Sequence, residues 1–313
     1  MVNQTSNTID ILNVWYRSIH GYSSLTVCIL GVVLNFFNII VLTRKHMRSS
    51  TNVILIALAL SDFLIKFIYI PTSFRFYLLN KNEEYDAFWT TYAIVFVSVT
   101  VTFHSISIWL TVFLAFFRYI YVCRNKIGKR LCTRRNAIKG SIITSIISIV
   151  FCTPSYFLSK IIQINNSTIY YEIVQSDVDR YTNGLIFRIT FIIQAFLIKL
   201  IPCLLLITLS GLLIHSIHKS NKNKSLKILS RRRMTISEKS RDHSRTNTIL
   251  VIVCILFFIT EFPQGIIALL SIIYESSNFH QNIYMKLGDL MDIISLINNS
   301  INFFLYCFMS FLL

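Results

Sequence analysis

Seven long apolar segments run through this chain, and they constrain its fold more than any other feature. They are centred on residues 24–43, 53–72, 92–117, 138–158, 185–214, 247–273 and 288–311. Each has about 20 residues or more, the length an α-helix needs to cross the hydrocarbon core of a membrane. Hydrophobic residues make up 54% of the chain and are gathered into these runs. We therefore expect an all-α fold, a bundle of seven transmembrane helices.

Basic residues are divided unevenly among the segments between the spans. Three alternate segments, 44–48, 123–139 and 219–245, hold 20 of the 30 Lys and Arg residues, whereas the N-terminal segment and the other three loops hold 6. Cytoplasmic loops are enriched in Lys and Arg, so we expect the N-terminus outside and the C-terminus inside the cell. The net charge of +16 then reflects basic loops beside anionic lipid, and we expect no nucleic-acid partner.

The predicted organisation has an extracellular N-terminal segment, residues 1–18, and one seven-helix domain, residues 19–313. Cytoplasmic loop 3 lies near residues 215–246 and is polar and basic. The last span ends close to Leu313, so we expect neither a cytoplasmic tail nor an eighth helix. Three sequons on predicted outer segments are candidate glycosylation sites; they begin at Asn3, Asn165 and Asn166.

Polar residues inside the spans are spaced so that they share helix faces. Such residues usually face the interior of a bundle, and residues three or four apart lie on one face of a helix. The third and seventh spans each carry a stripe of this kind: Thr100, His104, Ser107 and Thr111 in the third, and Asp292, Ser295, Asn299, Asn302 and Tyr306 in the seventh. In the second span, Asp62 and Lys66 also share a face. These stripes predict a hydrated interior cleft.

One acidic residue lies at apparent mid-membrane depth. Glu261 stands two residues before Pro263 in the sixth span, within "FFITEFPQGI". An ionisable group near the bilayer centre costs about 2.5–3.5 kcal/mol on insertion scales. We therefore expect Glu261 to face the bundle interior.

Motifs along the spans, in their order and spacing, resemble those of rhodopsin-like (class A) G-protein-coupled receptors over nearly the whole chain. They are "GVVLN" with Asn35, "LALSD" with Asp62, "FFRYIYV" with Arg118 and Tyr119, "LIPCLLL" with Pro202, Phe257 and Pro263 of the sixth span, and "NFFLY" from Asn302 to Tyr306. More narrowly, "LTRKHMRSSTNVILIALALSD", "ITEFPQGI" and "NNSINFFLYCFMS" are similar to invertebrate myosuppressin/FMRFamide-type peptide receptors and to the nematode serpentine receptor class W group.

The resemblance implies a multi-pass plasma-membrane receptor for an RFamide-like neuropeptide, with a heterotrimeric G protein and membrane lipid as its other partners. A chemosensory receptor for small environmental molecules is the first alternative, and a membrane transporter or channel is the second. We expect no enzymatic activity, because HExxH, GxSxG and glycine-rich phosphate-loop motifs are all missing from the sequence.

The resemblance also assigns roles to individual residues. The candidate ligand-binding residues are Thr100, His104, Gln194, Lys199, Glu261, Gln264, Asp289 and Asp292. The candidate residues for switching and G-protein coupling are Arg118, Tyr119, Phe257, Glu261, Pro263, Asn302 and Tyr306. A sodium ion is the one candidate cofactor, because a carboxylate with oxygen-bearing partners suits a hard cation; its candidate ligands are Asp62, Ser107, Asn298 and Asn302.

Each assignment has a structural alternative. Glu261 is either a polar latch in the conformational switch or half of an ion pair that only holds helices together; its expected neighbours are Lys199 and Asn298 or Asn299. The ammonium of Lys66 could take the place of sodium beside Asp62.

Near the outer mouth, Asp289 and Asp292 either accept the guanidinium of a peptide or form a salt bridge to Lys286 or Arg188. Arg118 either contacts the G protein or reaches out to lipid phosphates. His104 is either a pH-sensitive residue of the pocket or a histidine that is simply hydrogen-bonded.

Five positions depart from the usual class A pattern. They are Phe117 at the acidic position before the arginine, Phe303 at the proline of the seventh span, Ala93 at the disulfide cysteine, Thr144 near the tryptophan of the fourth span, and Glu261 at the tryptophan of the sixth. The lost acid leaves Arg118 without its adjacent carboxylate. The lost cysteine implies an outer loop that is held without a disulfide.

Overall fold

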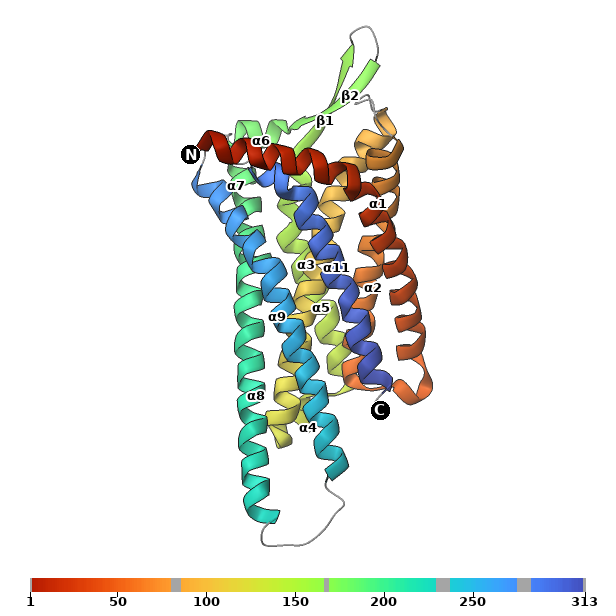
Figure 1. The fold of residues 1–313 in the computed structure, drawn as a ribbon, viewed down its shortest axis with the longest axis vertical. Helices are drawn as coiled ribbons and strands as arrows, with labels where there is room; N and C mark the ends of the chain where they lie inside the picture. The colour runs from red at the N-terminus through yellow and green to blue at the C-terminus, as the bar shows by residue number, and fades with distance from the viewer. Residues whose placement is uncertain (1, 80–85, 166–168, 229–236, 275–282, 312–313) are drawn as a thin grey trace.

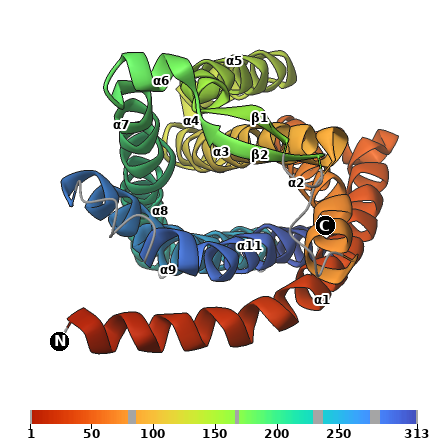
Figure 2. The same ribbon diagram turned by 90° about the horizontal axis from the view of Figure 1, so that it is seen from above.

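The computed structural model describes residues 2–79, 86–165, 169–228, 237–274 and 283–311. Long helices run side by side along one axis (Figure 1), and Figure 2 shows them arranged as a ring around that axis. Within the described residues, six helical stretches are long and apolar enough to cross a membrane: Ile19–Thr43, Ser50–Leu79, Ala87–Cys123, Arg134–Phe157, Leu185–Ser216 and Ile255–Ile273. The seventh predicted span lies in α11, Met285–Phe311. The predicted helical bundle is confirmed, and its orientation in the membrane stays a prediction.

The elements follow the predicted spans closely. The α-helices are α1 (Val2–Thr43), α2 (Ser50–Thr72), α3 (Ala87–Cys123), α4 (Asn125–Leu131), α5 (Arg134–Cys152), α6 (Asp177–Tyr181), α7 (Leu185–Ile192), α8 (Ile201–Ile228), α9 (Ser237–Ile273) and α11. Two short 3-10 helices are η1 (Lys45–Met47) and η3 (Thr153–Phe157), and two π-helical stretches are η2 (Ser73–Leu79) and η4 (Ile193–Leu200). The first helix is continuous across residue 18, and α8 and α9 extend into the predicted loop 3.

The two π-helical stretches lie next to prolines. Pro71 lies inside α2 just before η2, and Pro202 lies near the start of α8, just after η4. Proline donates no helical hydrogen bond and crowds the turn before it, and a helix relieves this by widening locally. This accounts for the widened turn of η4, which precedes Pro202, but not for η2, which follows Pro71. Such a turn shifts the residues that face the bundle interior. In the fifth span, η4 carries Lys199.

Apolar side chains form the inner seam of the bundle. Leu58 of α2 packs with Leu110, Leu114 and Phe117 of α3 in one buried cluster, which Leu42 of α1 joins. Exposed large apolar side chains on the helices, such as those of Phe36, Phe67 and Ile142, suit contact with lipid tails. The inner cluster explains why Phe117 is tolerated where an acid is usual, since a phenyl ring fills that core without a charge.

A β-hairpin is the one extended element in the described part of the chain. Strands β1 (Ser159–Asn165) and β2 (Ile169–Gln175) pair antiparallel between α5 and α7. The hairpin projects from the end of the bundle where the N-terminus lies, and the C-terminus lies near the other end (Figure 1). The expected all-α fold therefore carries a small addition in the loop at 159–183.

Candidate functional site

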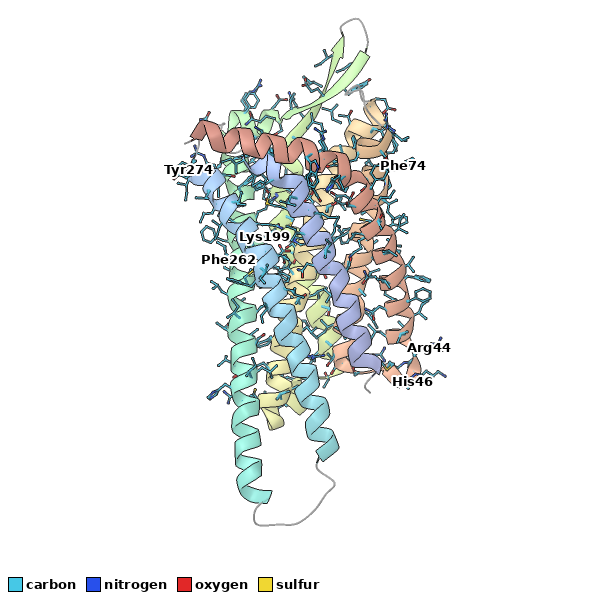
Figure 3. The ribbon with its side chains drawn as sticks, in the orientation of Figure 1. Arg44, His46, Phe74, Lys199, Phe262 and Tyr274 are labelled. Carbon is cyan, nitrogen blue, oxygen red and sulfur yellow. The ribbon has the colours of Figure 1, made fainter. Side chains whose placement is uncertain are left out.

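Five polar side chains from four helical segments meet inside the bundle, and we call them the interior ion cluster. They are His104 of α3, Lys199 of η4, Glu261 and Gln264 of α9, and Ser295 of α11. Figure 3 labels Lys199 in the half of the bundle nearer the hairpin. The Glu261 side chain is 0% exposed. A fully buried carboxylate needs charge and hydrogen-bond partners, because burial without them is costly.

Lys199 is the centre of this cluster. Its ammonium forms an ion pair with Glu261 and donates to Gln264 Oε1 at 2.8 Å. Ser295 Oγ donates to Glu261 Oε1 at 3.4 Å, and Gln264 Nε2 donates to Ser295 Oγ at 3.1 Å. The predicted pairing of Glu261 with Lys199 is confirmed. The contact from the seventh span comes from Ser295, so the expectation of Asn298 or Asn299 there was wrong by one turn.

Close approach of two helices makes the ion pair possible. Gly265 lies one turn after Glu261 on α9, and a Cβ added there would lie 2.8 Å from Cβ of Lys199. Since real Cβ atoms do not approach so closely, glycine lets η4 and α9 pack backbone to backbone at this level. The lysine stem then reaches the carboxylate directly.

His104 lies between the two charged partners. Its Nε2 is 3.1 Å from Lys199 Nζ and 3.2 Å from Glu261 Oε2. A ring nitrogen that carries a proton donates to the carboxylate, and one without a proton accepts from the ammonium. Because the same atom faces both groups, the protonation state of His104 decides which partner it bonds. The cluster therefore ties α3 to the junction of η4 and α9.

A second polar group lies at the end of the bundle nearer the N-terminus, and we call it the outer tyrosine cluster. It comprises Tyr16 and His20 of α1, Tyr69 of α2, Tyr77 of η2, and Asp289 and Asp292 of α11. Tyr77 OH donates to Asp289 Oδ1 at 2.6 Å, and Tyr69 OH donates to Asp292 Oδ2 at 3.4 Å. Both aspartates thus face tyrosines of neighbouring helices.

The remaining members form a chain of hydrogen bonds. His20 Nε2 lies 3.2 Å from Tyr69 OH, and His20 Nδ1 lies 3.3 Å from Tyr16 OH. With Nε2 protonated, each group donates to the next, from Tyr16 through His20 and Tyr69 to Asp292. Burial and the nearby Asp289 raise the pKa of Tyr16 to about 12. Tyr16 therefore stays a neutral hydroxyl, and it can donate the first bond of this chain.

Only the two aspartates of this cluster were predicted from the sequence. Tyr69 lies in an apolar segment, where an aromatic residue is expected to fill space. Tyr16, His20 and Tyr77 lie outside the predicted apolar segments. The sequence did hold one signal for this cluster: Tyr16 and His20 are four residues apart, so they lie on one face of a helix.

The candidate sodium ligands are only partly brought together. Ser107 Oγ donates to Asp62 Oδ1 at 2.6 Å, and both side chains are buried, as is Asn298. The side chain of Asn302 lies outside the described residues. Lys66 Nζ donates to the backbone carbonyl of Asp62 at 3.4 Å.

The coupling residues predicted from the sequence lie on α3, α9 and α11. Arg118 is 8% exposed and Phe257 is 5% exposed, so Arg118 lies within the bundle and does not reach out to lipid. Tyr119 is half-buried at the end of α3, and Pro263 lies inside α9. The side chain of Tyr306 lies outside the described residues.

Other predicted residues take no part in the two clusters. Thr100 Oγ1 is buried and has no hydrogen-bond partner among the described residues. Gln194 is half-buried in η4. Asn166 and the side chains of Asn3 and Asn165 lie outside the described residues, so glycosylation stays a prediction.

Similarity to known receptors agrees with this arrangement. The chain is 29% identical to the G-protein coupled receptor dmsr-1 of Caenorhabditis elegans, over 95% of this chain and 66% of that receptor. It is 24% identical to the Sex peptide receptor of Drosophila melanogaster, over 93% of this chain and 70% of the relative. It is 25% identical to the FMRFamide receptor of Drosophila melanogaster, over 89% of this chain and 49% of the relative. The chain thus spans between about half and 70% of the length of these relatives.

A family model described as the serpentine type 7TM GPCR chemoreceptor Srw matches residues 22–311, which is nearly the whole chain. The match includes the interior ion cluster and most of the outer tyrosine cluster. It favours the receptor interpretation over the transporter or channel alternative. This chain belongs to the Srw family of seven-transmembrane G-protein-coupled receptors.

Proposed function

We propose that this chain is a plasma-membrane receptor for an RFamide-like neuropeptide and passes ligand binding to a heterotrimeric G protein. Relatives named as sex peptide and FMRFamide receptors support a peptide ligand. The observation that carries the proposal is the acidic pair on α11. Asp292 is exposed even though its carboxylate bonds to Tyr69, whose side chain is 2% exposed.

The carboxylate of Asp292 points into the bundle and not toward lipid, because the Tyr69 hydroxyl that donates to it is buried. A guanidinium pairs with a carboxylate through two parallel hydrogen bonds, so the arginine of a peptide ending in Arg-Phe-amide suits Asp292. Asp289, one turn away, adds negative charge on the same helix. Tyr69 and Tyr77 hold the two carboxylates in place before the ligand arrives.

The signal then passes along α11. Ser295 lies three residues after Asp292 and bonds to Glu261. A ligand that pulls on Asp292 therefore acts on the same helix face that holds the interior ion cluster. If the ligand binds better when α9 has pivoted at Pro263, it shifts the receptor toward that state and exposes Arg118 to the G protein.

The proposal is tested in cells that express the chain with a promiscuous G protein. Amidated peptides ending in Arg-Phe are compared with the same peptides carrying Gln in place of Arg. We expect Asp292→Asn to reduce the potency of the Arg peptides by about tenfold or more, since a charge pair that becomes buried when a ligand binds contributes that much to binding. The same substitution should leave the weaker Gln peptides nearly unchanged.

Asp86→Asn is the matched control, because Asp86 is another acid near the same end of the bundle and asparagine preserves its N-cap bond to Trp89. Equal losses for the Arg and Gln peptides would mean that Asp292 does not bind the arginine.

A chemosensory receptor for small environmental molecules is the second candidate, because the family model carries the word chemoreceptor in its description. The same cells, treated with a panel of odorants, separate the two functions. A response to odorants together with silence across the RFamide peptides would replace the first proposal with the second.

A further inference from the structure

Among the residues whose side chains the structure describes, Lys66 is the largest that is fully buried, with 0% exposure. An ammonium removed from water without compensation carries a penalty of several kcal/mol. Lys66 lies one turn after Asp62 on α2, and Asp62 is itself 1% exposed. Two opposite charges are therefore buried one helical turn apart, and each offsets the cost of the other.

The side chain of Lys66 occupies space that Gly31 of α1 leaves free. A Cβ added at Gly31 of α1 would overlap Cδ of Lys66, would lie 2.5 Å from its Cε, and would lie 3.2 Å from Ser300 Oγ of α11. The lysine stem therefore passes between α1 and α11 at a level where only glycine fits. Lys66 Nζ ends within 3.4 Å of the carbonyl oxygen of Asp62.

The carboxylate of Asp62 is oriented from the other side. Ser107 of α3 donates to its Oδ1 at 2.6 Å, and Ser107 is 2% exposed. A hydroxyl donor and a neighbouring ammonium both complement the carboxylate of Asp62. A sodium ion added here would bring a second positive charge into the same buried space.

We infer that Lys66 is the resident cation of this part of the bundle and that it replaces a diffusible sodium ion beside Asp62. The charge is covalently attached, so it is present at any salt concentration. The stability of the bundle then does not depend on which monovalent cation surrounds it.

The test uses thermal unfolding of the purified full chain in sodium chloride and in N-methyl-D-glucamine chloride at equal ionic strength. For the natural protein we expect the same Tm in both salts. Lys66→Ala opens the space and leaves the carboxylate, so its Tm should be higher in sodium by about 2 °C or more, as for a ligand that binds only the folded state. This gain should disappear in the double variant Lys66→Ala/Asp62→Asn.

Two results would overturn the inference. One is a natural protein whose Tm rises in sodium, and this needs no variant. The other is a folded Lys66→Ala protein whose Tm is the same in both salts. The readout involves no peptide and no G protein, so failure of the proposed receptor function would leave it unaffected.

A second pair of variants tests the path of the lysine. Gly31→Ala should lower the Tm because the new methyl group meets Lys66, and the same substitution should lower the Tm much less when it is made in the Lys66→Ala variant. Gly211→Ala is the control, since a Cβ there meets no atom within 4 Å. A Gly31→Ala protein as stable as the natural one would show that Lys66 does not occupy this space.

Discussion

At the scale of single residues, Glu261 is a fully buried acid at the sixth-span position where the class A pattern has a tryptophan. Its carboxylate binds Lys199, His104 and Ser295, which belong to three other helical segments. Both partners of such a buried ion pair are needed, because removing either one leaves the other charge buried and unpaired. We therefore expect Glu261 to hold the resting arrangement of the fifth and sixth spans.

Glu261→Gln should raise basal G-protein signalling by about fivefold or more, the range of typical coupling energies, while surface expression is retained. The glutamine can still bond to Ser295, but it no longer neutralises Lys199. Basal second-messenger output, divided by surface expression, measures the effect. Glu172→Gln, at an exposed position in β2, serves as the control. Loss of expression without a change in basal output would leave only the structural ion pair.

At the scale of the element, the hairpin is held by a buried aspartate and not by a disulfide. Asp179 of α6 is 1% exposed; it accepts from Gln175 Nε2 at 2.6 Å and from the amide of Phe187 at 2.9 Å. The first bond fixes the end of β2, and the second fixes the start of α7. Asp179 thus links the hairpin to the fifth span.

Asp179→Asn should loosen the hairpin. The NH₂ group of asparagine would face either Gln175 Nε2 or the Phe187 amide, and since both of these groups are donors, one hydrogen bond would be lost. Each buried hydrogen bond lost this way costs about 1–3 kcal/mol, so amide hydrogens of β1 and β2 should exchange about five- to a hundredfold faster. Hydrogen exchange followed by mass spectrometry measures this. Asp177→Asn, which alters the exposed pair with Lys160, should leave those rates unchanged. Equal acceleration in both variants would mean that Asp179 is not the anchor.

The elements also show what the sequence could and could not predict. Hydropathy located the spans, and helical periodicity placed His104 and Ser295 on the stripes that meet Glu261. Periodicity could not predict the contacts between helices, because the period of one helix does not say which residue of another helix lies opposite. The turn shift produced by η4 and the close approach at Gly265 set those pairings. For the same reason the tyrosine partners of Asp289 and Asp292 were missed.

At the scale of the whole molecule, two polar clusters share one helix. Asp292 belongs to the outer tyrosine cluster, and Ser295 belongs to the interior ion cluster, three residues further along α11. Ligand binding and the resting constraint are therefore expected to be coupled energetically. Residues coupled in this way give double variants whose effects do not add.

A double-variant cycle on Asp292→Asn and Glu261→Gln measures that coupling through agonist potency. If binding at Asp292 acts by weakening the Glu261 constraint, then Asp292→Asn should cost less potency in a background where the constraint is already gone. We expect the difference to be about threefold or more, beyond the error with which independent sites add. Asp86→Asn in place of Asp292→Asn should give additive effects. Additivity in the main cycle would mean that the ligand reaches the G-protein side by a route that bypasses Ser295 and Glu261.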